Sequence, residues 1–343
     1  MAVGDLTFID SFDLSSYALG LAADPATGIV LLAFYGHGVL SFRPDDAGDL
    51  VHLDTDDQGA TAYGVAIDPV TRIVLLANGS QGLLSYSMDP VTGELTFIEA
   101  DFQNDSANHV AVDPVTGLVV VANGDGGVQS YSVDGAGTLT FIDSDDQGGT
   151  HGYVSFDPVT GFILLATQTS GLKSYSMDGA GTLTFIDSDD QGGIARQVTT
   201  HPPTGLILLA NGHSGLSSYS MDGAGTLTFI DSDDQGGHAY GVSVDPESGL
   251  ILLSNGPSGL SSYSMDGAGT LTFLSALDIG EYATQTVVEQ PRGFVFLANS
   301  GGGIATFSLE RPPFESLLSG GLGISGLPGG LGFSGALDFH SVW

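Results

Sequence analysis

The chain has 343 residues, and its 6 Lys and Arg residues against 40 Asp and Glu residues give a formal net charge of −34. This charge argues against nucleic acid and anionic lipid surfaces as partners, because both would be repelled. There is no cysteine, which excludes disulfides and thiolate metal sites. No apolar run approaches the roughly 18 residues of a membrane span, so we expect no membrane insertion.

The acidic excess has two explanations. One is that an Asp-rich turn was copied along the chain and carried its charge with it. The other is adaptation to high salt, where screening removes the self-repulsion of such a charge. The second explanation is favoured by the depletion of lysine beyond the copied turns, since Lys173 is the only lysine.

The most informative pattern is an internal repeat. Residues 174–193 recur almost letter for letter at 218–237, and looser copies cover nearly the whole chain. A period of 44 or 45 residues predicts an array of identical supersecondary units. Seven units are defined by leucines in register, namely Leu6, Leu50, Leu95, Leu139, Leu183, Leu227 and Leu271.

Each unit predicts four short strands. In the second unit we expect strands at 63–67, 73–77, 83–88 and 95–98, separated by turns rich in Gly, Asn, Asp and Pro. Four such strands, repeated without helical periodicity between them, are typical of a propeller blade. A solenoid is the alternative, although its repeats are usually shorter and need distinct capping ends.

The two ends of the repeat array predict a closed ring. The chain starts on a fourth-strand sequence at 6–9 and ends its last repeat on a third-strand sequence at 304–308. The first strand can therefore complete the last blade and cover the exposed sheet edges. We predict an all-β, seven-bladed propeller over 1–311, followed by a separate tail over 312–343.

The blade framework resembles a known family. It reads Tyr-Ser-Met/Val-Asp before Gly-Thr-Leu-Thr-Phe-Ile, followed by Gly-Val, Asp-Pro-x-Thr-Gly and Ile-Leu-Leu-Ala-Asn-Gly. Over about 6–309 it is similar to the seven-bladed lactonase-like propellers, which include the bacterial 6-phosphogluconolactonases. The resemblance implies this fold and a lactone hydrolase with basic and acidic residues around the central channel. Arg196 is the basic residue at a comparable place here.

Acidic loops repeat on one face of the predicted ring. Strand direction alternates, so the fourth-to-first and second-to-third loops share a face, which we call the top. The Asp-Ser-Asp-Asp-Gln-Gly loops on it match the first half of a calcium loop, but the bidentate Glu that should follow is missing. The alternative is a solvated turn whose Asp side chains cap local backbone groups. The candidate calcium ligands are Asp143, Asp145, Asp187, Asp189, Asp231 and Asp233.

The positions at which the copies differ predict a binding site. Framework residues are repeated, whereas Tyr, His and Arg replace one another where the chain enters or borders the top of the channel. The functional interpretation is a partner or glycan site on loops held by a rigid scaffold. The alternative is that converging strands need varied side chains to fill the channel. The candidate ligand-binding residues are Tyr17, Tyr63, His109, His151, Tyr153, Arg196, His213, His238, Tyr240 and Tyr282.

The enzymatic alternative uses part of the same set. His151, Arg196 and His238 are the candidate catalytic residues of a lactonase-like hydrolase, which would polarise a lactone and activate water. It requires these three side chains to converge on one pocket at the top of the channel. No cofactor other than calcium is expected.

The tail differs in composition from the repeats. It is rich in glycine and large apolar residues, which are costly to leave in water, and we expect it to anchor the propeller to other subunits. The candidate anchoring residues are Phe314, Leu318, Leu327, Phe333, Phe339 and Trp343.

These features favour a non-enzymatic propeller, displayed on a virion appendage or as a surface-layer component of a salt-adapted system. Residues 1–6 lack the basic and apolar regions of a signal peptide. We expect a virion or extracellular assembly as its location, with a cytoplasmic one as the alternative.

Overall fold

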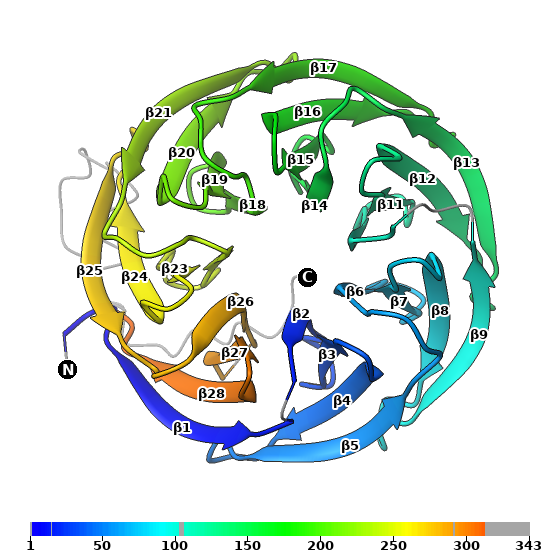
Figure 1. Cartoon of the computed structure of the whole chain (residues 1–343), viewed down its shortest axis with the longest axis horizontal. Helices are drawn as coiled ribbons and strands as arrows, with labels where there is room; N and C mark the ends of the chain where they lie inside the picture. Colours follow the sequence, from blue (N-terminus) through cyan, green and yellow to red (C-terminus); the bar gives the residue numbers. More distant parts are fainter. Residues whose placement is uncertain (1, 15, 103–105, 291, 313–343) are drawn as a thin grey trace, which may run out of the picture. The chain divides into compact units, whose positions relative to one another are not determined.

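The computed structural model describes the chain except for residues 1, 15, 103–105, 291 and 313–343. The unit Met1–Arg311 contains strands β1 to β28, which form seven four-stranded antiparallel sheets. Figure 1 shows the sheets as blades arranged around a central channel. The predicted all-β seven-bladed propeller is confirmed. Among the described residues, no helix is long and apolar enough to cross a membrane.

Blades 1 to 6 each consist of four consecutive strands, which run from the channel to the rim (Figure 1). Blade 1 contains β2 (Ala18–Ala23), β3 (Val30–Phe34), β4 (Gly38–Pro44) and β5 (Leu50–Asp56). Blade 2 contains β6 (Gly64–Ile67), β7 (Val74–Ala77), β8 (Leu83–Met88) and β9 (Leu95–Asp101). Blade 3 contains β10 (His109–Val112), β11 (Val119–Ala122), β12 (Val128–Val133) and β13 (Leu139–Asp145).

The next three blades repeat the plan with small changes in strand length. Blade 4 contains β14 (His151–Phe156), β15 (Ile163–Thr167), β16 (Gly171–Met177) and β17 (Leu183–Asp189). Blade 5 contains β18 (Gln197–His201), β19 (Leu206–Ala210), β20 (Leu216–Met221) and β21 (Leu227–Asp233). Blade 6 contains β22 (Gly241–Val244), β23 (Ile251–Ser254), β24 (Leu260–Met265) and β25 (Leu271–Leu277).

Blade 7 closes the ring with strands from both ends of the propeller sequence. It contains β26 (Tyr282–Val288), β27 (Phe294–Ser300), β28 (Gly303–Leu309) and the N-terminal β1 (Leu6–Phe12). Strand β1 pairs antiparallel with β28, with Phe8 opposite Phe307. The predicted closure by the N-terminal strand is therefore confirmed.

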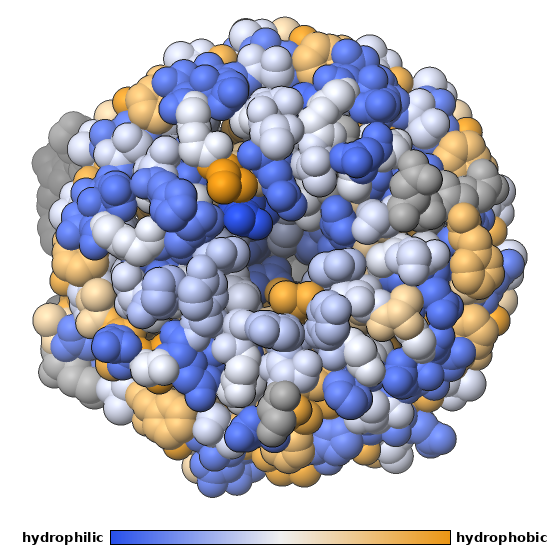
Figure 2. Space-filling view, viewed as in Figure 1, coloured by the Kyte–Doolittle hydropathy of each residue, from blue (hydrophilic) through white to orange (hydrophobic). Residues whose placement is uncertain are grey.

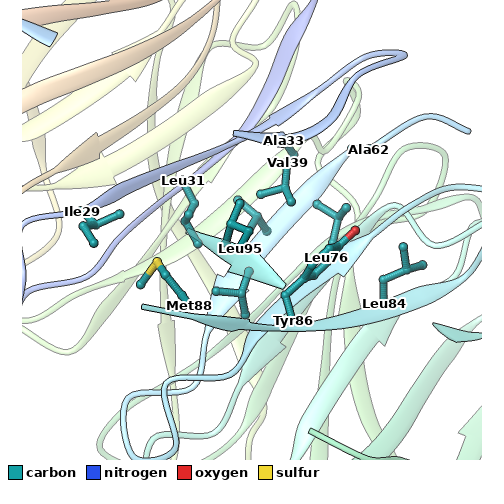
Figure 3. Close-up of a cluster of buried hydrophobic side chains, with 12 residues drawn as sticks. Ile29, Leu31, Ala33, Val39, Ala62, Leu76, Leu84, Tyr86, Met88 and Leu95 are labelled. Atoms are coloured by element: carbon teal, nitrogen blue, oxygen red, sulfur yellow. The ribbon is translucent and has the colours of Figure 1, made fainter. Parts of the chain in front are cut away.

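The core lies between the blades. The second strands are buried on both faces, as their continuous apolar runs predict; all of β7, for example, is buried. Their side chains alternate between the two neighbouring blades. Figure 3 shows one such cluster, in which Ile29, Leu31 and Val39 of blade 1 pack with Leu76 and Tyr86 of blade 2.

Two hydrogen bonds recur between neighbouring blades. In the first, a fourth-strand carboxylate accepts the backbone N–H of the leucine that begins the next fourth strand, as Asp187 does from Leu227 at 3.0 Å. In the second, a third-strand serine donates to a glycine carbonyl of the next blade, as Ser174 does to Gly225 at 2.7 Å. The carboxylates are Asp10, Asp54, Glu99, Asp143, Asp187 and Asp231.

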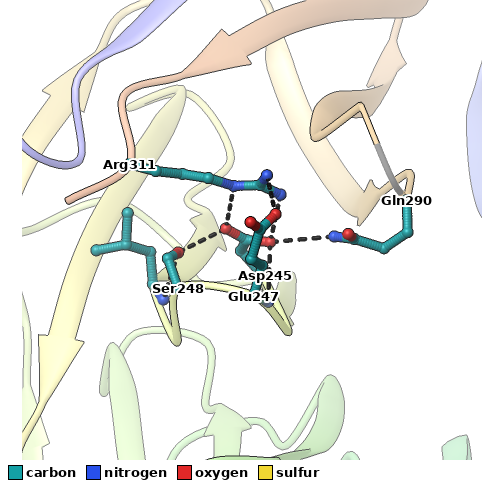
Figure 4. A network of polar contacts seen from close by, with 6 residues as sticks. Asp245, Glu247, Ser248, Gln290 and Arg311 are labelled. Atoms are coloured by element: carbon teal, nitrogen blue, oxygen red, sulfur yellow. Dashed lines mark hydrogen bonds and ion pairs between the residues drawn. The ribbon is translucent and has the colours of Figure 1, made fainter. Parts of the chain in front are cut away.

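The junction between blades 6 and 7 differs from this pattern. Ser275 stands at the position of the carboxylate, and the hydroxyl of Ser262 is buried without a hydrogen-bond partner. An ionic network joins the two blades instead (Figure 4). Arg311 of blade 7 donates to both carboxylate oxygens of buried Asp245 at 2.6 and 2.7 Å, and it also pairs with Glu247. Gln290 donates to Asp245 at 3.2 Å.

Candidate functional site

The central channel is closed by side chains from a single register position. Each blade contributes one first-strand residue, namely the one that pairs with the same repeat position of the second strand in every blade. These seven first-strand residues form a layer that we call the floor. The floor residues are Gly20, Gly64, His109, Tyr153, Gln197, Gly241 and Gln285. Four blades thus supply polar side chains and three supply glycine.

Tyr153 spans the floor. Its hydroxyl accepts hydrogen bonds from the amides of Gln197 at 2.9 Å and Gln285 at 3.3 Å. The two glutamines are in turn held by the backbone of the next blade, since Gln285 accepts from Leu21 N–H at 2.7 Å and Gln197 from Val242 N–H at 3.2 Å. Burial raises the pKa of Tyr153 to about 12, so the phenol stays protonated at neutral pH.

His109 completes the floor by stacking on Tyr153, with ring centroids 3.6 Å apart. The imidazole is buried and its Nδ1 atom has no hydrogen-bond partner. Burial lowers the pKa of His109 to about 3, because it disfavours the charged form. His109 is therefore neutral at physiological pH.

Glycine is required where the floor side chains approach a neighbouring backbone. A Cβ atom on Gly64 would lie 2.7 Å from the His109 ring, and one on Gly241 would lie 2.7 Å from the Gln197 side chain. The glycines of the floor therefore leave the space that the large polar side chains of neighbouring blades occupy. His109 and Tyr153 thus pack across the channel, and their part in ligand binding stays a prediction.

Above the floor lies a cavity of about 360 Å³. Its wall is formed by the residue that precedes each floor residue, together with Gln168. The wall residues are Leu19, Tyr63, Asn108, Gly152, Arg196, Tyr240 and Thr284. Figure 2 shows the hollow at the centre of the ring with largely hydrophilic surface around it. The structure thus brings five predicted ligand-binding residues into one cavity: Tyr63, His109, Tyr153, Arg196 and Tyr240.

Arg196 is the charged residue of this wall. Its guanidinium lies over the Tyr240 ring, 4.9 Å from the centroid, in a cation–π contact. The Nε atom is buried without a hydrogen-bond partner. Tyr240 also accepts a hydrogen bond from the hydroxyl of Tyr282 at 2.9 Å, and burial raises the pKa of Tyr282 to about 12.

The remaining predicted residues border the cavity or lie outside it. His238 packs on Tyr240 at 4.6 Å and on exposed His213 at 4.1 Å. Burial lowers the pKa of His238, and His213 and Arg196 lower it further. Tyr17 is exposed and packs edge-to-face with Tyr35 at 5.8 Å.

Of the three candidate catalytic residues, Arg196 lines the cavity and His238 lies beside it. His151 begins strand β14, but its side chain is outside the described residues. None of the residues that line the cavity is Asp or Glu. The described wall and floor therefore offer no carboxylate to activate water or orient a histidine.

The acidic repeats have local hydrogen-bond partners. Asp143, Asp187 and Asp231 lie on the fourth strands and accept inter-blade amides, as described above. Asp145, Asp189 and Asp233 accept hydrogen bonds from the side chain of the glutamine two residues later, at 2.7 to 2.8 Å. Within the described part of the chain, no three His, Asp or Glu side chains group as they would around a metal ion. Calcium binding stays a prediction.

Comparisons with known proteins agree with the seven-bladed fold. A family model described as lactonase, 7-bladed beta-propeller, matches residues 71–206. The blade framework is lactonase-like. A solved structure of a Lactobacillus plantarum protein matches with a TM-score of 0.73 and 17% identity, over 83% of this chain and 92% of its own. A streptogramin B lyase structure matches with a TM-score of 0.68 and 11% identity, over 89% and 97%. No curated protein matches the chain.

Sequence reasoning missed parts of the upper cavity. Gln197 and Gln285 hold Tyr153, and Asn108 and Gln168 line the wall. A residue-by-residue alignment of the first strands singles out Asn108, Gln197 and Gln285, whereas Gln168 follows the second strand β15 (Ile163–Thr167). The six predicted anchoring residues of the tail lie outside the described residues.

The channel also opens below the floor. There, a second cavity of about 570 Å³ is lined mainly by small apolar residues of the first strands, such as Ala66 and Val112, and by turn prolines such as Pro114. Polar residues form a smaller share of its lining than of the upper cavity's, and no Arg, Lys, Asp or Glu among the described residues faces it, which makes the upper cavity the better candidate for recognition.

Proposed function

We propose that the protein is a non-enzymatic binding propeller that recognises a glycan at the top of its channel. The observation that carries this proposal is the cavity above the floor, which combines tyrosine rings, side-chain amides and one arginine. A cavity of about 360 Å³ is within the range of small-molecule sites. Rigid aromatic rings and amides on a stiff scaffold suit a polar ligand with apolar faces.

A panel of immobilised neutral and acidic oligosaccharides tests the proposal. We expect the wild-type protein to bind at least one of them, and Tyr240→Ala to weaken this binding at least ten-fold because the ring forms part of the wall. Tyr35→Ala is the matched control, since Tyr35 is exposed and does not line the cavity. Equal losses in the two variants would contradict the cavity as the site.

The second candidate function is lactone hydrolysis. It is supported by the family model over 71–206 and by the position of Arg196 beside His238. The absence of a carboxylate from the described cavity lining favours binding instead. Hydrolysis of a six-membered sugar lactone, followed above the spontaneous rate, distinguishes the two. Turnover that is lost in Arg196→Ala would support the enzyme and count against the binding proposal.

The proposed setting is a larger assembly, either a virion appendage or a surface layer of a salt-adapted system, with the tail as anchor. It is supported by the tail's composition and by the charge of −34. A chain that ends after Arg311 retains every strand of the propeller. We expect this truncated chain to fold but to leave its assembly. Retention in the assembly would contradict the anchor.

A further inference from the structure

Arg196 differs from the other basic residues of the chain. Each of the other five reaches carboxylate or backbone carbonyl oxygens, as Arg43 does with Pro90 and Val91 at 3.2 and 2.9 Å. These five are Arg43, Arg72, Lys173, Arg292 and Arg311. Arg196 has the Tyr240 ring as its described partner and no carboxylate. Among the described basic side chains, Arg196 is thus the one with neither a carboxylate nor a carbonyl oxygen as its partner.

The position of Arg196 leaves its guanidinium available to a ligand. The Tyr240 ring contacts the guanidinium through Cζ, and this contact leaves the N–H groups at its edge able to donate to a ligand. The group is partly buried in the wall, and its Nε has no partner. Buried donors without acceptors cost free energy, so an acceptor supplied by a ligand would be favourable.

The charge in the cavity indicates the kind of anion. Arg196 is the one full positive charge among the lining residues. A carboxylate carries a single negative charge and matches the planar guanidinium in a bidentate pair. A phosphate monoester carries about −1.5 to −2 at neutral pH and would be left with uncompensated charge.

The rest of the wall indicates what carries the carboxylate. The amide of Gln168 offers a donor and an acceptor for hydroxyl groups, and Tyr63 offers a ring for an apolar face. We infer that Arg196 forms a carboxylate subsite, and that the ligand is a sugar acid of the uronic acid class. This inference rests on the proposed function and names its ligand class.

Calorimetric titration with D-glucuronate and with the neutral methyl glucoside tests the inference. We expect glucuronate to bind the wild-type protein more tightly than the glucoside does, and Arg196→Gln to weaken glucuronate binding at least ten-fold while leaving the glucoside unaffected. Arg196→Lys should be intermediate, because it keeps the charge but loses the planar fork. Arg43→Gln is the matched control and should bind both sugars as the wild type does.

The outcomes separate this inference from the proposed function. If glucoside and glucuronate bind equally well, or if Arg196→Gln leaves glucuronate binding unchanged, the carboxylate subsite is wrong but glycan binding stands. If inorganic phosphate displaces glucuronate and binds more tightly, the preference for a carboxylate is wrong. If neither these two sugars nor the oligosaccharide panel binds the wild-type protein, the proposed function fails as well.

Discussion

At the scale of single residues, the floor of the channel makes a prediction about pH. His109 is buried, and its pKa is lowered from 6.5 to about 3 by that burial. Below pH 6.5 the unfolded chain gains a proton on this residue, whereas the folded protein does not until about pH 3. His109 therefore costs no stability above pH 6.5, and its cost grows as the pH falls toward 3.

Replacing His109 with glutamine isolates this effect. Glutamine fits the layer, because Gln197 and Gln285 occupy equivalent register positions. Relative to its own value at pH 7.5, the variant should lose less stability at pH 5 than the wild type does, by roughly 2 kcal/mol. Urea unfolding at the two pH values measures the difference. Parallel loss of stability in both proteins would show that His109 is not the responsible group.

The residue scale also shows why sequence reasoning located the site but not its construction. Tyr63 and His109 are both candidate ligand-binding residues, yet the structure places Tyr63 in the wall and His109 in the floor. Side chains alternate along a strand, so a shift of one residue moves a side chain to a different layer. The differences between the copies identified the right segment of each repeat, the start of the first strand. It could not assign the layer, because the entry loops differ in length and the strands carry bulges, as between His151 and Tyr153.

At the scale of strands and blades, the period, the strand order and the ring closure could all be predicted from the repeated leucines and turns. The fourth strands were predicted too short; 95–98 was expected, whereas β9 covers Leu95–Asp101. A register shift between Ser85 and Tyr86 extends this pairing past the apolar run. Because the fourth strands are longer than predicted, the repeated carboxylates such as Asp187 lie on strands and not in loops. There they accept the hydrogen bonds that join neighbouring blades.

The junction between blades 6 and 7 makes a prediction about stability. Ser275 stands where Asp231 and its equivalents accept the amide of the next blade, and Leu6 is the corresponding leucine. Ser275→Asp should restore this hydrogen bond and raise the free energy of unfolding by about 1 kcal/mol. Ser232→Asp adds the same charge on an exposed side chain of β21, away from the junction between blades 6 and 7, and should give no gain. Equal effects of the two substitutions on urea unfolding would contradict this role.

At the scale of the whole molecule, the net charge of −34 sets the response to salt. The described basic residues act mainly as local contacts, as Arg311 does between blades, so they do not neutralise the surface. Self-repulsion destabilises a compact state, and raising the salt concentration from 0.1 to 1 M shortens the screening length from about 10 to about 3 Å. The thermal unfolding midpoint should therefore rise with sodium chloride.

A variant with less charge tests whether repulsion is the cause. Asp46→Asn, Asp49→Asn and Glu94→Gln remove three charges from exposed side chains and change −34 to −31. We expect the combined variant to unfold at a higher temperature than the wild type at 0.1 M salt, with the two midpoints converging at 1 M. Convergence follows because screening removes the same repulsion that the substitutions remove. A midpoint that falls with salt, or a variant that keeps its advantage at 1 M, would instead place the effect in local contacts at the substituted turns.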